Sequence, residues 1–201
     1  MAQKFFDKWP AEGIEVRDMG LKQYMSVEPK FSMHASGRQA HRQFGKAHIS
    51  IVERLMNKIM RSGPGNKKVG GRVIRGTHAC GKKQKAYNIV KDAFIIIESK
   101  TNNNPVQVLV SAIEKSAPRE ETTRISYGGI SYHHAVDSSS QRRLDVALKN
   151  IAGAAYAASF KNKKGIEECL ADELIYASKG DMKSSAVKRK EETERIARGA
   201  R

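Results

Sequence analysis

The 201-residue chain has few aromatic residues, few cysteines and no long apolar run. Its length suggests one domain, or one domain with extensions, and its 6% of aromatic and 39% of hydrophobic residues predict a modest core. The longest apolar stretches, such as residues 94–97, are far too short to cross a bilayer. Residues 1–10 contain Asp7 and no apolar run, so we do not expect a signal peptide there.

The scarcity of cysteine and of paired acidic residues argues against several kinds of site. Cys80 and Cys169 do not make a disulfide framework, so a reducing cytoplasm is the default compartment. His78 with Cys80 is too small a set for a zinc site, and Cys169 lacks a partner. No Ser/His/Asp or paired-carboxylate arrangement stands out. We therefore expect no metal, no cofactor and no enzymatic activity.

One segment resembles the sequence motif of a nucleotide-binding loop. Residues 76–83 match the pattern G-x-x-x-x-G-K up to its last position. That position needs a Ser or Thr oxygen to hold Mg²⁺, and Lys83 offers none. The segment therefore argues against nucleotide hydrolysis, although Gly and Lys before a helix suit a backbone phosphate of any kind.

The positive charge is concentrated in one segment. The net charge of the chain is +16, and residues 34–91 hold fourteen Lys and Arg against one acid, Glu53, which gives +13. So much like charge repels itself unless a polyanion neutralises it. An anionic membrane would call for a basic amphipathic helix, whereas here the densest charge lies in a Gly-rich loop at residues 66–81. This favours a nucleic acid, with a merely solubilising surface as the plain alternative.

Apolar residues recur with helical spacing in most of the chain. The expected helices begin near residue 45 and near residue 81, at Pro105 after its capping Asn104, after residues 137–139, and near residue 165. Residues 184–198 are charged nearly all round and form either a helix on a polyanion or a frayed tail. The expected fold is mainly α, a bundle of about six helices.

Two other features complete the expected architecture. Residues 1–44 show little periodicity and read as a largely irregular N-terminal extension lying on a partner or on the core of a helical domain at 45–201. Between helices, residues at about 121–136 alternate with a period of two around Gly128-Gly129, which predicts a β-hairpin arm. A lone hairpin is marginal in water, so its apolar face is expected to rest on something. That face carries Ile125, Tyr127, Ile130 and Tyr132, and the other carries Arg124, Ser126, Ser131 and His133.

Basic residues at helix beginnings indicate phosphate binding. Lys82, Lys83 and Lys85 fall in the first turn of a helix, where the dipole disfavours cations and the free backbone N–H groups favour an anion. Arg142 and Arg143 repeat this arrangement. Such side chains would neutralise RNA phosphates, unless they only extend into solvent. His133 beside Tyr132 suits stacking or hydrogen bonding to RNA.

Several runs, in order, closely resemble the ribosomal small-subunit protein seven family in its archaeal and eukaryotic branch. They are Gly81-Lys82-Lys83 followed after five residues by Ile89-Val90-x-x-Ala93, then Asn104 to Leu109, Ala112-Ile113-Glu114, Ala117 to Glu121, Arg124-Ile125-x-Tyr127-Gly128-Gly129-Ile130, Gln141-Arg142-Arg143-x-Asp145-x-Ala147-Leu148, Ser159-Phe160-Lys161, Ile166 to Glu173, and Ser184 to Arg201. The resemblance covers about residues 45–201. The long loop at 63–80 departs from the short bacterial connection.

The resemblance implies a structural protein of the cytoplasmic small ribosomal subunit. It implies a primary binder of small-subunit (16S-type) rRNA that nucleates assembly of the subunit head, near the tRNA exit site, the decoding region and the mRNA path. The implied neighbours are head and platform proteins of the small-subunit protein nine and eleven families, with no membrane and no DNA. A DNA-binding regulator is the rival, but no recognition helix with a polar reading face is evident.

The candidate residues fall into two sets. The expected rRNA-binding residues are Arg38, Arg42, Lys67, Lys68, Arg72, Arg75, Lys82, Lys83, Lys85, Arg119, Arg124, Arg142, Arg143, Lys188 and Arg189. The expected hairpin residues near tRNA and mRNA are Arg124, Ser126, Tyr127, Gly128, Gly129, Tyr132 and His133.

Overall fold

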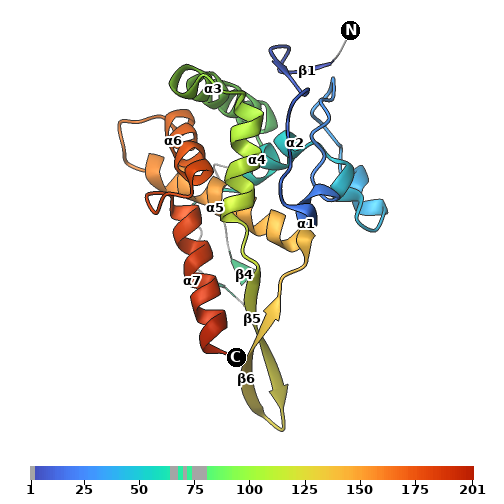
Figure 1. Ribbon diagram of the computed structural model, residues 1–201, viewed down its shortest axis with the longest axis vertical. Helices are drawn as coiled ribbons and strands as arrows, with labels where there is room; N and C mark the ends of the chain where they lie inside the picture. Colours follow the sequence, from blue (N-terminus) through green and yellow to red (C-terminus); the bar gives the residue numbers. More distant parts are fainter. Residues whose placement is uncertain (1–2, 64–67, 70–71, 74–80) are drawn as a thin grey trace.

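The computed structural model describes residues 3–63 and 81–201, and the backbone of 68–69 and 72–73 (Figure 1). In this part of the chain it confirms a mainly α-helical fold with a protruding hairpin. The α-helices are α1 (Met19–Lys22), α2 (Ile51–Ile59), α3 (Lys83–Thr101), α4 (Pro105–Ser116), α5 (Ser140–Ser159), α6 (Ile166–Lys179) and α7 (Ser185–Gly199). The strands are β1 (Lys4–Phe5), β2 (Trp9–Pro10), β3 (Lys68–Val69), β4 (Arg72–Val73), β5 (Glu120–Tyr127) and β6 (Ile130–Asp137), and two 3₁₀ turns are η1 (Arg38–His41) and η2 (Gly45–His48).

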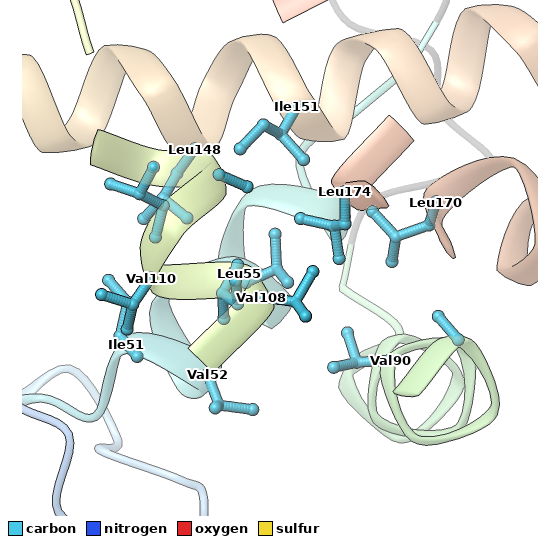
Figure 2. Packing of buried hydrophobic residues seen from close by; sticks show 14 of the residues in the cluster. Ile51, Val52, Leu55, Val90, Val108, Val110, Leu148, Ile151, Leu170 and Leu174 are labelled. Carbon is cyan, nitrogen blue, oxygen red and sulfur yellow. The ribbon is translucent and has the colours of Figure 1, made fainter. Parts of the chain in front are cut away.

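Apolar side chains of five helices meet in a single core. Leu55 of α2, Val90 of α3, Val108 of α4, Leu148 of α5 and Leu174 of α6 are all buried, and they converge in Figure 2. Burial of each such side chain stabilises the fold by about 1.5–3 kcal/mol. The core thus holds α2–α6 in fixed relative positions, and these helices carry the basic side chains discussed below.

Helix ends follow the predicted signals except at the N-terminal side of the body. The Asn104 side chain accepts from the Val106 N–H with Pro105 at the first helical position, and Gly180 ends α6 in the left-handed region at φ 75°. The helix expected from about residue 45 instead begins at Ile51. Residues before it form η2 and then an extended Ile49, so the basic residues around 45 lie outside the helix.

The hairpin has the predicted register over a slightly longer span. Ile125 pairs with Tyr132 and Tyr127 with Ile130 on either side of the Gly128-Gly129 turn, where both glycines have positive φ. Figure 1 shows it reaching away from the helical body, with α7 beside its base. Its apolar face does not rest on the described body: Tyr127 is 82% exposed and the other three side chains of that face are at least half exposed, so the expected support for the face stays a prediction. No other part of the described chain covers them.

The N-terminal segment is more ordered than expected and is part of the core. β1 pairs with β2, which turns Phe5, Phe6 and Trp9 inward. Phe6 and Trp9 each meet the Phe94 ring of α3 edge to face, with centroids 5.8 and 5.7 Å away. Leu21 of α1 is also fully buried. These aromatic contacts anchor the segment to α3.

Polar side chains of α4 hold the backbone between these anchors. The Gln107 amide accepts from the Glu15 N–H and donates to the Glu15 carbonyl, at 2.9 and 3.2 Å. One Glu114 carboxylate oxygen accepts from the N–H groups of Arg17 and Asp18. Residues 15–18 therefore lie along α4 although they have no regular secondary structure of their own.

The charged C-terminal segment forms α7 and packs on the body. Ala186, Val187 and Ala197 are buried, and an ion pair joins Arg201 to Glu120 at the base of the hairpin. Within the described residues, no helix is long and apolar enough to cross a membrane.

Candidate nucleic-acid interface

The three lysines at the start of α3 have different surroundings. Lys82 is the N-cap residue and makes no side-chain cap bond, and both Lys82 and Lys85 are exposed. Among the described residues neither has an ion-pair partner. Lys83 instead donates to Glu53 Oε1 at 2.6 Å, with its side chain only 19% exposed. Lys82 and Lys85 thus remain available to an external anion, while Lys83 is engaged in joining α3 to α2.

Glu53 shows why a lone acid lies in the basic segment. Its side chain is buried, and the oxygen that accepts from Lys83 also accepts from the Ala35 N–H at 2.6 Å. A buried carboxylate needs such partners, because its desolvation is otherwise costly. Glu53 therefore fastens both α3 and residue 35 to α2.

A second acid is shared by three cations. Asp145 of α5 lies 2.9 Å from Lys58 Nζ, 3.3 Å from Lys46 Nζ and 3.5 Å from Arg54 Nη2. Burial by itself would raise the pKa of Asp145, but the hydrogen bond to Lys58 and the charges of Arg54 and Lys46 outweigh it and hold the pKa below its ordinary value. Burial in turn lowers the pKa of Lys58, which the contact with Asp145 only partly offsets. The cluster carries a positive excess.

A cavity of about 430 Å³ connects these groups. It lies between residues 34–39, α2 and the start of α3, and its lining holds five Lys and Arg but only two carboxylates, Glu53 and Asp145. The basic lining residues are Lys46, Arg54, Lys58, Arg61 and Lys83. This electropositive hollow, with Lys82 and Lys85 nearby in the chain, is suited to a polyanion such as an RNA backbone.

Four of these lining residues were absent from the predicted binding set. Lys46, Arg54, Lys58 and Arg61 all belong to the basic segment at residues 34–91, but charge alone does not distinguish them from its other cations. The spacing of four residues places Arg54 and Lys58 on one side of α2, and Arg61 follows three residues later in the turn after the helix. This periodicity was a usable signal, whereas the pairing with Asp145 was not.

The two arginines at the start of α5 both have acidic partners. Arg142 contacts Glu121 at 2.6 Å and is 63% exposed. Arg143 contacts Asp18 at 2.7 Å and is 11% exposed. Burial alone would raise the pKa of Asp18, but Arg143 and the Gly20 N–H hold it below its ordinary value. Arg143 thus joins the N-terminal segment to α5, and its part in RNA binding stays a prediction.

The remaining described candidates are spread over the surface. Arg38 and Arg42 are exposed in and after η1, and the Arg38 Nε donates weakly to the nearby Ala35 carbonyl at 3.4 Å. Arg119 is exposed, and its backbone N–H donates to Glu194. Lys188 and Arg189 are exposed near the start of α7, and Arg124 is exposed on the hairpin opposite His133. The structure does not gather them into one site.

Part of the predicted set lies outside the described residues. Lys67 and Arg75 are outside altogether, and for Lys68 and Arg72 only the backbone is described, in the antiparallel pair β3–β4. This pair replaces part of the expected continuous loop. The hairpin set is fully described: Ser126 Oγ lies 3.4 Å from Ser131 Oγ, and Tyr132 and His133 are exposed.

The sequence is similar to a family of known proteins. Residues 22–201 match the family model described as Ribosomal protein S7p/S5e. The chain belongs to this family. A relative named small ribosomal subunit protein uS7, from Methanosphaera stadtmanae, is 51% identical over 200 residues and covers all of both chains. The S7 pattern thus begins earlier than the resemblance from about residue 45 suggested.

Membership of the S7p/S5e family makes the chain a ribosomal protein with a structural, non-enzymatic role. Among the residues that the structure describes, no group of three His, Cys, Asp or Glu is placed to hold a metal ion.

Proposed function

We propose that this ribosomal protein is a primary binder of small-subunit rRNA that nucleates assembly of the subunit head. The observation that carries the proposal is the cavity beside α2, which five Lys and Arg line with two carboxylates, together with the exposed Lys82 and Lys85 at the start of α3. The name of the relative, small ribosomal subunit protein uS7, supports a place in the small subunit. Binding would release counterions from the phosphates, and specificity would come from the shape of the folded RNA.

The β5–β6 hairpin is the second surface that we expect to contact other molecules. Its exposed Ile125, Tyr127, Ile130 and Tyr132 contribute no core packing, so the arm is suited to contacts outside the chain. We assign to it the proximity to exit-site tRNA and mRNA. The proteins of the nine and eleven families are neighbours of the protein as a whole. Location in the small subunit of the cytoplasmic ribosome follows from the same proposal.

Filter binding with a transcript of the rRNA head domain tests this function. The purified chain is expected to bind the transcript, with affinity falling by about 10³- to 10⁵-fold between 50 and 200 mM salt if six to ten phosphates are contacted. Duplex DNA of equal length serves as competitor. Displacement of the RNA by equimolar DNA would favour a DNA-binding regulator instead.

Sedimentation provides an independent test. The tagged chain, expressed in cells, is expected to move with the small ribosomal subunit in a sucrose gradient. Its presence only in the soluble fractions at the top of the gradient would contradict a structural role in the subunit.

A further inference from the structure

The C-terminal end of α5 carries an aromatic pair that the core does not use. The Tyr156 and Phe160 rings are stacked, with centroids 6.2 Å apart and planes at 26°. Phe160 is 56% exposed, and neither ring belongs to the hydrophobic cluster or to the side chains packed against it. Single exposed hydrophobic side chains are common on protein surfaces, so this pair indicates a ligand only together with the charges around it.

The loop after Phe160 is purely basic. Residues 160–165 include Lys161, Lys163 and Lys164 and no acid, and all three lysines are exposed. The Lys161 ammonium lies 5.8 Å from the centroid of the Phe160 ring. The dipole of α5 favours a cation at this end, which accounts for one lysine but not for three.

The conformation of Lys161 supports this argument. It follows the C-cap residue Phe160 in the left-handed region, at φ 56°. The equivalent turn after α6 uses Gly180, which adopts this conformation without steric cost. The fold alone would therefore favour glycine at 161, and the lysine side chain is retained at a small cost in strain.

The acidic residues nearby are already engaged elsewhere. Asp172 contacts Lys100 at 2.7 Å and Lys164 at 3.6 Å, so it is shared. Glu167 and Glu168 occupy the first turn of α6, where its dipole favours negative charge. Lys161 and Lys163 have no ion-pair partner among the residues described.

We propose that Phe160, Lys161, Lys163 and Lys164, here called the 160–164 surface, bind a second segment of RNA with an unpaired base stacked on Phe160. Aromatic faces accept any base, and adjacent lysines neutralise the flanking phosphates. This inference rests on the proposed rRNA-binding function and adds a contact to it.

The 160–164 surface lies at the C-terminal end of α5, far from the other end of that helix. α5 runs from α1 toward α6 in Figure 1, with Asp145, which lines the electropositive cavity, near one end and Phe160 just beyond the other. A helix of this length spans about 30 Å. The protein would thus hold two RNA segments at the opposite ends of one rigid helix, which is a means of fixing their relative positions.

Two variants of the full chain test the surface with the head-domain transcript. Phe160→Leu keeps an apolar side chain but removes the ring, and is expected to weaken binding about tenfold, the loss of one stacked base. The triple variant Lys161→Gln, Lys163→Gln and Lys164→Gln is expected to lower the salt slope by about two, at −0.7 per single-strand phosphate. Tyr176→Leu is the matched control, because Tyr176 is also an exposed ring with a lysine, Lys183, 5.9 Å from its centroid.

A third variant reports on the stacking itself. Phe160→Trp places an exposed indole at the site, while Trp9, the one natural tryptophan, is buried. Quenching of the new emission by RNA alone supports the proposal. The proposal would be overturned if the first two variants kept the affinity and the salt dependence of the unmodified chain. It would also be overturned if the tryptophan emission changed only when other subunit proteins were present. Failure of the unmodified chain to bind the transcript would instead reject the proposed function as well.

Discussion

The Glu173 carboxylate accepts a hydrogen bond from the Ser184 hydroxyl at 2.7 Å and thereby joins α6 to the start of α7. Ser184 is the N-cap of α7, and its hydroxyl oxygen accepts from the Val187 N–H. The same Glu173 oxygen accepts from the Ala186 N–H at 2.9 Å. One buried acid therefore satisfies the end of a helix that is otherwise charged nearly all round.

Removal of this acid should loosen α7. Glu173→Ala leaves the Ser184 hydroxyl and the Ala186 N–H without their acceptor, and we expect a loss of about 2–3 kcal/mol in the free energy of unfolding. Urea denaturation followed by circular dichroism measures it. Glu191→Ala, on the exposed side of α7, is the control and should change stability by less than about 0.5 kcal/mol. Equal stability of the two variants would contradict the assigned role.

The Asp145 cluster should make stability depend on acid pH. Because its folded-state pKa is lowered, the stabilisation is fully present above the unfolded value of about 3.9 and is lost as the pH falls through the folded pKa. Asp145→Asn should lower stability at pH 7 by about 2 kcal/mol and flatten the loss between about pH 5 and pH 2. Part of the pH dependence of stability should remain in this variant, because the pKa of Asp18 is also lowered in the folded state.

Denaturant titrations at several pH values provide the measurement. Asp92→Asn, an exposed acid on α3, is the control and should retain the full slope. An Asp145→Asn curve parallel to that of the unmodified chain at every pH would show that the three cations do not stabilise the carboxylate.

The Arg143–Asp18 contact should control docking of the N-terminal segment. Arg143→Gln leaves a partly buried Asp18 without its cation, so we expect faster amide exchange in residues 15–22 and a loss of about 1–3 kcal/mol. Arg17→Gln lies in the same segment, but its exposed side chain has no such partner among the described residues. Exchange that is equally fast in both variants would argue against the ion pair as the anchor.

Sequence patterns located the helices and the hairpin because their signals are local. Asn104 before Pro105, Gly180 after α6 and the Gly128-Gly129 turn each act within a few residues. The docking of the N-terminal segment had no such signal. Its contacts, such as Glu15 with Gln107 and Arg143 with Asp18, join residues 92 and 125 positions apart through side chains of ordinary surface type.

The candidate site was predictable in charge but not in detail. The basic excess of residues 34–91 agrees with the cations that line the cavity beside α2 and the start of α3. Nothing in the sequence shows that Lys83 is committed to Glu53 while Lys82 and Lys85 are not. Such distinctions depend on which helices meet, and this is decided by the core.

The hairpin should be dispensable for folding and for primary rRNA binding. Replacement of residues 124–133 by a short turn removes side chains that are exposed, so the unfolding midpoint of the body should stay close to that of the full chain. Affinity for the head-domain transcript should be largely kept, whereas protection of exit-site tRNA or mRNA in assembled subunits should be altered. An unfolded deletion variant would place the hairpin in the core instead.

The salt dependence of rRNA binding by a Lys82→Gln, Lys85→Gln variant tests the central claim most directly. Filter binding of the head-domain transcript between 50 and 200 mM salt measures it. Lys115→Gln with Lys179→Gln removes the same charge from exposed positions on α4 and α6 and is the control. The account predicts that the Lys82→Gln, Lys85→Gln variant binds more weakly than the control. The slope of its log affinity against log salt concentration should be smaller by about two, at about −0.9 per phosphate contact. An affinity and a slope equal to those of the control would contradict it.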